Sequence, residues 1–293
     1  MKMDILDIKS TKIGYACAFL SAILFGSIST LAKPTVETIS PLLLAALVSF
    51  IAAAVLTPLT YKAKFNISKR NLGLILIVSI LGAVLAPSLY FFGLEYTTAS
   101  DATILSNSEI IFTVILALVF FKERLKRTGY FSMALVFIGI ILIATNFEFD
   151  NFVLEPNIGN LLIIGTMALW ALDNNISKII TKSVNVARIV QLKSLISGII
   201  LIGLVFLLGI SIDIDQEKIP NIVLLGTIGF ALPMFFFYNA IKRIGTVRTI
   251  LIFSTSAIFG VIYASIFLGE QIREYQVIAM IIMLAGIFIM HRK

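Results

Sequence analysis

The chain has 293 residues, of which 59% are hydrophobic and 13% are charged, with one cysteine and a net charge of +7. About a quarter of the residues of a soluble domain are charged, so this composition excludes a soluble fold and favours a membrane protein. The positive charge does not indicate nucleic-acid binding, and we expect no nucleic-acid partner, because the basic residues lie in short links between apolar runs.

Ten apolar runs follow one another, each close to the ~20 residues that a helix needs to cross the hydrocarbon core. The predicted spans are 13–32, 41–61, 72–94, 102–121, 129–146, 158–177, 187–209, 220–241, 249–268 and 275–290. We therefore expect an all-α membrane protein with ten transmembrane helices. Basic residues before the first run are typical of a signal peptide, but that run is too long for one, so we expect an uncleaved first span.

The second half of the chain repeats the first at a spacing of 145 to 147 residues. The matched pairs include Gly14 and Gly159, Pro87 and Pro233, and Glu123 and Glu270. We expect two domains, 13–146 and 158–291. Because each domain holds five spans, an odd number, the second must be inverted relative to the first. Inverted repeats are typical of secondary transporters.

The distribution of basic residues predicts the orientation of the chain. If the N-terminus is cytoplasmic, 19 of the 23 Lys and Arg residues fall on inner segments. The outer loops then hold Lys33, Lys218 and Arg273. Cytoplasmic loops carry such an excess, so we expect both termini in the cytoplasm and the protein in the inner (plasma) membrane.

Three formal charges lie inside predicted spans: Glu109, Asp173 and Lys193. A charge at mid-helix costs ~2.5–3.5 kcal/mol on insertion scales, so each should face a partner or a cavity. Asp173 and Lys193 lie at about the same depth, ~10 Å from the cytoplasmic boundary, and form a candidate ion pair. This pair either fastens the sixth and seventh helices or forms an inner gate or a contact for a substrate carboxylate. Alternatively, Lys193 extends to the interface.

Glu109 lies near the middle of the bilayer and has no basic partner that the sequence reveals. A medium of low dielectric constant disfavours an ionised carboxylate, so Glu109 is a candidate for proton coupling. The alternative is a protonated structural side chain that is hydrogen-bonded to a neighbouring helix. Glu123 and Glu270 lie at helix ends, where structural capping is the better interpretation.

The sixth span has a polar face, because Trp170, Asp173, Asn174 and Ser177 recur at helical spacing. The predicted substrate-contacting residues are Glu109, Trp170, Asp173, Asn174, Lys193, Asn107, Ser177, Tyr90, Tyr238 and Asn239. Pro87 and Pro233 interrupt the third and eighth spans, and we expect hinges there that free the carbonyl groups of Ala83 and Gly229.

Residues 121–125 (FKERL) and 268–272 (LGEQI) resemble the LGE-x-L turn that ends the fourth helix of each half in the drug/metabolite transporter superfamily. Residues 238–241 (YNAI) resemble the exit from helix eight in the same superfamily. The chain is thus similar to a ten-helix EamA-type permease over nearly its whole length. The resemblance implies a central cavity between helices 1–4 and 6–9, with helices 5 and 10 outside it.

The resemblance also implies a secondary carrier, often an exporter of amino acids and related metabolites. We expect alternating access, with proton coupling through Glu109 as one option. The alternative is a proton-coupled exporter of drugs or organic cations. An intramembrane enzyme is disfavoured, because the chain has one histidine, one cysteine and none of the usual hydrolase motifs. We expect no cofactor and no metal; the partners are a small-molecule substrate, the lipid bilayer and, as an option, protons, and the oligomeric state stays open.

Overall fold

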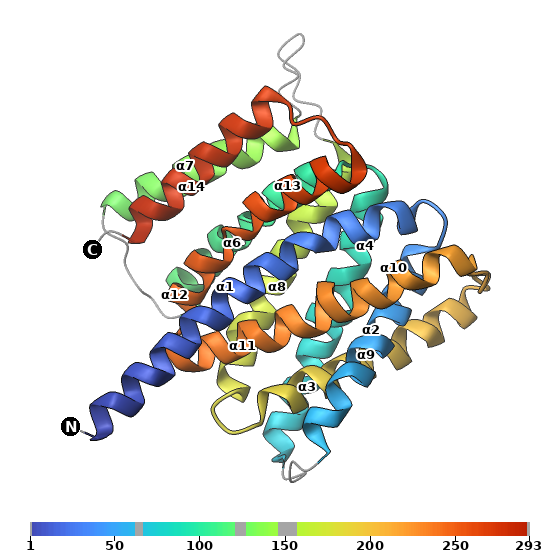
Figure 1. Cartoon of the computed structure of the whole chain (residues 1–293), viewed down its shortest axis with the longest axis horizontal. Coiled ribbons are helices and arrows are strands. Elements are labelled where there is room, and N and C mark those ends of the chain that lie inside the picture. The colour runs from blue at the N-terminus through green and yellow to red at the C-terminus, as the bar shows by residue number, and fades with distance from the viewer. Residues whose placement is uncertain (1, 62–66, 121–126, 146–156, 292–293) are drawn as a thin grey trace.

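The computed structural model describes residues 2–61, 67–120, 127–145 and 157–291, and their regular structure is helical throughout (Figure 1). The first half contains α1 (Lys2–Val36), α2 (Pro41–Thr60), α3 (Lys69–Ser79), η1 (Ile80–Leu85), α4 (Ala86–Glu95), α5 (Ala99–Leu105), α6 (Ser108–Phe120) and α7 (Arg127–Ala144). The second half contains α8 (Ile158–Ile180), α9 (Val186–Leu207), η3 (Gln216–Lys218), α10 (Ile219–Leu224), η4 (Leu225–Ala231), α11 (Leu232–Ile244), α12 (Thr246–Phe253), α13 (Ser256–Leu268) and α14 (Glu274–His291).

The described helices form ten rods, which we number span 1 to span 10 in chain order. Spans 3 and 8 are α3–η1–α4 and α10–η4–α11, and spans 4 and 9 are α5–α6 and α12–α13. By length and composition, seven stretches of the described chain can cross a membrane: Ser10–Val36, Pro41–Thr60, Lys69–Glu95, Arg127–Ala144, Val186–Leu207, Gln216–Ile244 and Arg248–Leu268. The other three rods are the split span 4, the shorter apolar α14, and α8, whose sequence includes Asp173, Asn174 and Asn175.

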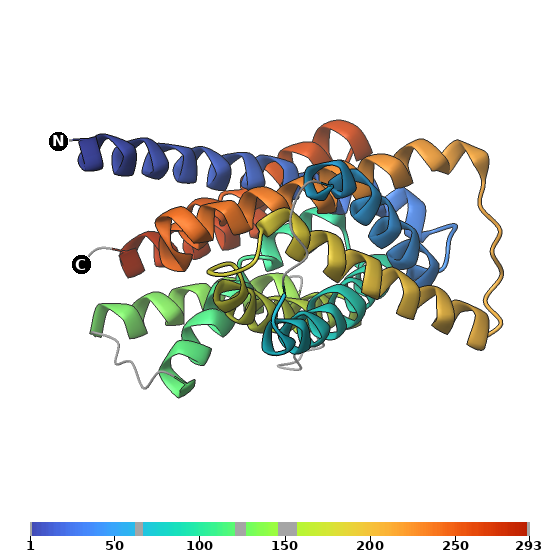
Figure 2. The same ribbon diagram turned by 90° about the horizontal axis from the view of Figure 1, so that it is seen from below.

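Each half contributes equivalent rods to the packing. Two pairs of equivalent helices pack against each other: α2 packs on α9, and α7 packs on α14. Other contacts come in exchanged pairs: α1 packs on α11 as α8 packs on α4, and α1 packs on α13 as α8 packs on α6. The start of α1 and the end of α14 lie at the same end of the bundle (Figure 2). This arrangement is that of a duplicated chain with ten spans.

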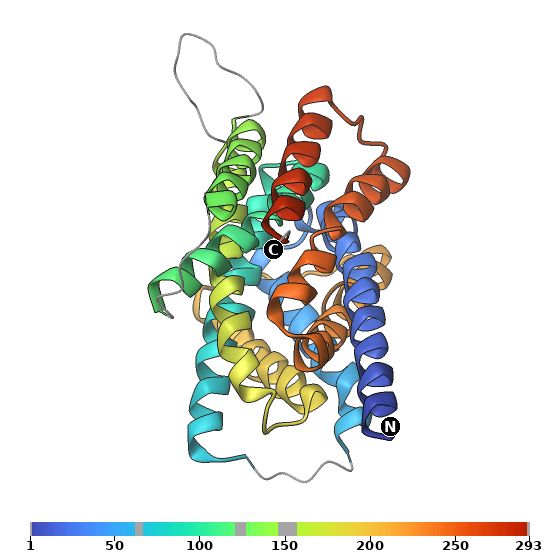
Figure 3. The ribbon, with the colours of Figure 1, turned by 90° about the vertical axis from the view of Figure 1, so that its left-hand side faces the viewer.

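Helices α7 and α14 lie together at the edge of the bundle, away from α2 and α9 (Figures 1 and 3). They are spans 5 and 10, the two helices expected outside the central cavity. Gly139 of α7 lies against Met283 of α14, and Gly286 of α14 lies against Ser132 of α7, so the two helices approach closely at small residues.

The small residues of span 1 that recur every four positions, Gly14, Ala18, Ala22 and Gly26, form a packing surface. Ala18 and Ala22 are fully buried, and a Cβ atom on Gly26 would lie 2.9 Å from the backbone nitrogen of Gly260 in α13. A Cβ atom on Gly260 would in turn overlap the side chain of Thr103 in α5. In lipid, helices associate through such close van der Waals contact, so these glycines hold spans 1, 4 and 9 together.

The fourth and ninth spans, predicted as single apolar runs, are each interrupted once in the structure. The structure has turns at Ser106–Asn107 and at Ser254–Thr255, so that span 4 divides into α5 and α6 and span 9 into α12 and α13. The Ser106 hydroxyl donates to the Ala102 carbonyl, and the Ser254 hydroxyl donates to the Leu251 carbonyl. Hydroxyl groups that bond to nearby carbonyls compete with the helical hydrogen bonds, which explains why both rods are interrupted at polar residues.

The predicted effect of the two prolines is also corrected. Pro87 and Pro233 each follow a π-helical segment, η1 and η4, in which the backbone N–H bonds five residues back. The Ala86 N–H accordingly donates to the Leu81 carbonyl. In this register, the carbonyl group that Pro87 leaves without a backbone donor is that of Gly82. From α-helical geometry we had expected it to be the carbonyl group of Ala83.

Replacement of Gly260 tests the close packing of spans 1, 4 and 9. The change Gly260→Ala should destabilise the protein by about 1–3 kcal/mol, because the new methyl group has no space beside Thr103. The control is Gly203→Ala in α9, where a Cβ atom meets nothing within 4 Å. Thermal unfolding in detergent measures both. Equal melting temperatures for the two variants would contradict this account of the packing.

Candidate functional site

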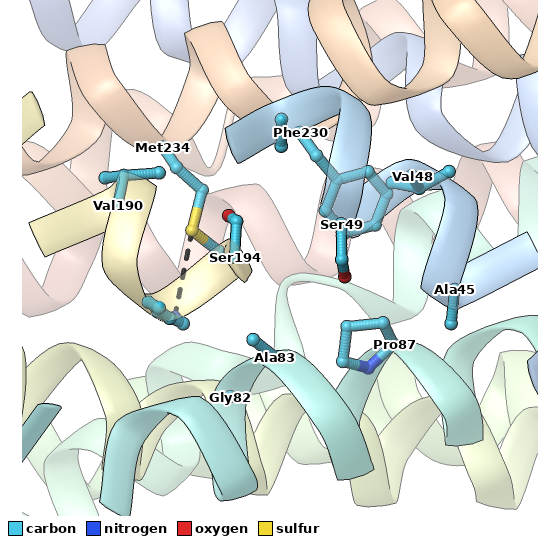
Figure 4. A pocket seen from close by; sticks show the side chains of 12 residues that line it. Ala45, Val48, Ser49, Gly82, Ala83, Pro87, Val190, Ser194, Phe230 and Met234 are labelled. Atoms are coloured by element: carbon cyan, nitrogen blue, oxygen red, sulfur yellow. Dashed lines mark hydrogen bonds between the residues drawn. The ribbon is translucent and has the colours of Figure 1, made fainter. Parts of the chain in front are cut away.

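A cavity lies where α2, α9 and the two π-helical spans meet, and we call it the axial cavity (Figure 4). The residues that line it are Ala45, Val48, Ser49, Ala52, Gly82, Ala83, Pro87, Val190, Lys193, Ser194, Phe230 and Met234. Several are repeat equivalents at a spacing of 145, such as Ser49 with Ser194 and Val48 with Lys193. The cavity therefore lies on the axis that relates the two halves.

Asp173 and Lys193 form a buried ion pair beside the axial cavity. The Lys193 ammonium contacts Asp173 Oδ2, and the side chains are 1% and 0% exposed. Tyr238 Oη lies 3.2 Å from both Lys193 Nζ and Asp173 Oδ2, and the Ser177 hydroxyl donates to Asp173 Oδ1 at 3.1 Å. The structure thus brings together four of the predicted site residues, from α8, α9 and α11. Lys193 does not extend to the interface.

The first half of the chain closes over this ion pair at Gly82. A Cβ atom at Gly82 would overlap the Asp173 carboxylate, so the absence of a side chain lets η1 lie directly on α8. Trp170 Nε1 donates to the Gly82 carbonyl at 3.1 Å. This is the carbonyl that Pro87 leaves without its π-helical donor, so the only tryptophan of the sequence satisfies a backbone group that a proline has freed.

A second cavity contains the other predicted acid, and we call it the aromatic cavity. It is lined by Ser21, Phe25, Glu109, Trp170, Asn174, Pro233, Met234, Phe237 and Phe253. Asn174 Nδ2 donates to Glu109 Oε1 at 2.7 Å, and Glu109 is only 4% exposed. In the described chain, Glu109 makes no ion pair. The first-half carboxyl group thus meets a second-half amide.

The rings of the aromatic cavity touch one another in a chain. Phe25 lies 5.6 Å from Trp170 and 4.6 Å from Phe253, and Phe237 lies 4.7 Å from Phe253, all between ring centroids. Phe25 and Trp170 are repeat equivalents, at a spacing of 145. Both halves therefore supply aromatic faces next to the Glu109 carboxyl group.

The single polar cavity expected from the sequence is therefore two cavities. Glu109, Trp170 and Asn174 line the aromatic cavity, whereas Lys193 lines the axial cavity. Met234, which follows Pro233 in α11, lines both. The Asp173–Lys193 pair and the Met234 side chain separate the two groups of residues.

The remaining predicted site residues lie around these cavities. Tyr90 is buried, bonds to Ser29 at 2.6 Å and packs its ring on Trp170 at 5.6 Å. Asn239 donates to the Phe235 carbonyl of its own helix. Asn107 lies in the turn between α5 and α6, and its Nδ2 atom has no hydrogen-bond partner in the described part of the chain. None of these three residues lines either cavity.

Sequence reasoning missed Ser49, Ser194, Met234 and Gly82 as cavity residues. The repeat carried a signal for two of them, because Ser49 and Ser194 are matched polar residues in otherwise apolar spans. No sequence signal distinguishes Met234 from the other methionines.

Glu270 is a capping residue, as expected, but it caps a helix of the other half. Its carboxylate accepts the backbone N–H groups of Ala99 and Ser100 at 2.8 and 3.0 Å, at the start of α5. Asp101 of α5 in turn accepts from Gln276 of α14 at 2.7 Å. These contacts join the halves at the end of the bundle opposite the chain termini. Glu123, the repeat counterpart of Glu270, lies outside the described residues.

This architecture is that of a multi-pass membrane protein built from two equivalent halves, with a few ionisable side chains buried in an apolar interior. The chain belongs to the EamA-like transporter family, whose model matches residues 12–145 and 157–292. This family consists of transporters and not of enzymes.

Two relatives named as transporters cover nearly the whole chain, and a third, named as an exporter, covers about half of it. An uncharacterized transporter of Methanothermobacter thermautotrophicus is 27% identical over 95% of this chain and 86% of its own length. The uncharacterized transporter YyaM of Bacillus subtilis is 26% identical over 91% of this chain and 89% of its own. The pseudopaline exporter CntI of Pseudomonas aeruginosa is 25% identical over 54% of each chain.

The fold also matches a solved crystal structure. The TM-score is 0.69 with 16% sequence identity, and the match covers 97% of this chain and 96% of the other. At this identity the likeness supports the fold and carries no information about the substrate.

A double-mutant cycle on Asp173 and Lys193 tests whether the two residues act as a pair. Either Asp173→Asn or Lys193→Met leaves one buried charge unpaired, which should cost about 3–5 kcal/mol. The double variant carries neither charge and should recover most of this loss. The measurement is the unfolding midpoint in detergent. A double variant that loses the sum of the two single effects would show that the residues are not coupled.

Proposed function

We propose that the protein is a secondary transporter that exports amino acids or related small metabolites by alternating access, with the substrate bound next to Glu109. The observation that carries this proposal is the aromatic cavity, in which Glu109 of the first half bonds to Asn174 of the second. A substrate bound there contacts both halves, so a movement of one half against the other changes the side to which it is exposed.

The interrupted rods are suited to such movement. The π-helical segments precede Pro87 and Pro233 at equivalent places in the two halves, and spans 4 and 9 divide at nearly equivalent turns. Discontinuous helices at corresponding positions of inverted repeats are typical of substrate sites. We propose that Pro87 and Pro233 act as the hinges.

Glu109 is the proposed site of proton coupling. The ionisable groups near it are Asp173, which is already paired with Lys193, and Tyr238, which bonds to the same pair. No cation of the described chain neutralises Glu109, so the carboxyl group can bind either a proton or a cationic group of the substrate, but not both at once. Such exclusive binding couples the two fluxes in opposite directions.

We propose that the protein lies in the plasma membrane with both termini in the cytoplasm. The basic residues of the sequence lie mainly in the segments that are then internal. Export is supported by the relative from Pseudomonas aeruginosa that is named an exporter.

A second candidate function is the export of organic cations. The charge of Lys193 is balanced by Asp173, whereas Glu109 stands next to the rings of Phe25, Trp170 and Phe253 without a basic partner. Aromatic faces and a carboxylate together bind ammonium groups, and each well-placed ring contributes about 0.5–2 kcal/mol to the binding free energy. This candidate differs from the first only in whether the substrate also carries a carboxylate.

Flux measurements in proteoliposomes test the proposed function. With a panel of amino acids and organic cations and an imposed pH gradient, the gradient should drive uptake or release of at least one compound. The change Glu109→Gln should reduce the gradient-driven flux by about tenfold or more, because the amide cannot exchange a proton. The control is Glu274→Gln, at an exposed carboxylate in the first turn of α14. Full coupling in Glu109→Gln would contradict the proposed role.

A further inference from the structure

We propose that the axial cavity is a carboxylate-binding subsite, formed by Lys193, Ser194 and Ser49, and that the substrate is a small zwitterion. This inference rests on the proposed function, because the ammonium group of the same substrate would lie against Glu109 in the aromatic cavity.

The first argument is the unused hydrogen-bonding capacity of Lys193. A lysine ammonium group has three donors. Two of them are directed to Asp173 Oδ2 and Tyr238 Oη. The remaining neighbour is Met234 Sδ at 3.9 Å, drawn as the dashed line in Figure 4. A thioether is a weak acceptor, so a carboxylate oxygen that enters the cavity gains a better-matched bond with this third donor.

The second argument is the pair of hydroxyl groups that line the cavity with Lys193. Ser194 lies one residue after Lys193 on α9, and its hydroxyl makes no hydrogen bond within the described residues. The Ser49 hydroxyl points toward the middle of the cavity from α2 (Figure 4) and has one partner, the Ser197 hydroxyl at 3.1 Å. A buried ammonium and two hydroxyls in a mainly apolar pocket are a suitable donor set for one carboxylate.

The third argument is the balance of charge. Asp173 and Lys193 together are neutral, so a simple anion bound at Lys193 would add an uncompensated negative charge inside the membrane. A zwitterion adds no net charge, and its ammonium group finds Glu109 and the rings of the aromatic cavity. The balance of charge at the two subsites therefore favours a zwitterion over a simple anion.

The fourth argument is the position of Met234 between the two cavities. This side chain lines both of them, and it directly follows the proposed hinge residue Pro233. Methionine is unbranched and adapts readily to its surroundings, so it allows one substrate to reach both subsites.

Calorimetric titration of the full-length protein in detergent tests the inference. The probes are three amino acids, each with its decarboxylated amine: leucine with isoamylamine, phenylalanine with phenethylamine, and lysine with cadaverine. At least one amino acid should bind about tenfold more tightly than its amine, because it makes one more set of charge-assisted hydrogen bonds.

Two variants should remove this preference. Ser194→Ala should weaken binding of the amino acid by about five- to tenfold and leave binding of the amine unchanged. The double variant Asp173→Asn with Lys193→Met removes the ammonium without leaving a lone buried charge, and it should abolish the preference. The control is Ser88→Ala in α4, whose hydroxyl bonds to the Val84 carbonyl of the same rod and lines neither cavity.

The outcomes separate this inference from the proposed function. If the amines bind and depend on Glu109, but the carboxylate adds nothing, the carboxylate subsite is refuted and the export of cations stands. A carboxylate preference that survives both Ser194→Ala and the double variant also refutes the subsite. If no probe binds the wild-type protein at all, the result contradicts both the subsite and the proposed substrate class.

Discussion

The structure depends on the need to compensate the charges of Glu109, Asp173 and Lys193, which are buried in the middle of the bundle. Asp173 and Lys193 neutralise each other, with Tyr238 and Ser177 completing the hydrogen bonds of the carboxylate. Glu109 has an amide partner and no counter-ion in the described chain. Because α8 supplies Trp170, Asp173 and Asn174, one rod connects the ion pair, the isolated acid and the π-helical segment of the other half. The rest of the bundle holds this rod in place by close packing of small residues.

The two halves share a scaffold but not a chemistry. Pro87 and Pro233 follow equivalent π-helical segments, and α2 packs on α9 across the axis. Within this symmetric frame, Lys193 is matched by Val48, and Asp173 by Ile28. The second half therefore provides both members of the ion pair. The first half provides the Glu109 carboxyl group, which has no counter-ion in the described chain. A symmetric scaffold can alternate between two equivalent conformations, while its asymmetric side chains determine what it binds.

Much of the fold follows from hydropathy, charge and repetition, because these properties can be obtained from the sequence without knowledge of how the helices pack. The ten rods, the family and the contact between Asp173 and Lys193 could be predicted, since a buried charge needs a partner at its own depth. The split at Ser106–Asn107 and the π-helical register at Pro87 could not be predicted. Both depend on small differences in free energy between alternative hydrogen-bonding patterns of the backbone. The division into two cavities escaped prediction for another reason: apolar spans show little periodicity, so the sequence does not reveal that Met234 faces the interior.

The most direct measurement of the central claim, that substrate binds between the halves beside α8, is the intrinsic fluorescence of Trp170. It is the only tryptophan of the sequence and lines the aromatic cavity, so no label is needed. For any compound that the protein transports, the account predicts an emission change that saturates over the concentration range in which transport saturates. A transported compound that leaves the emission of Trp170 unchanged at saturating concentration would contradict it and would require a transport path elsewhere in the bundle.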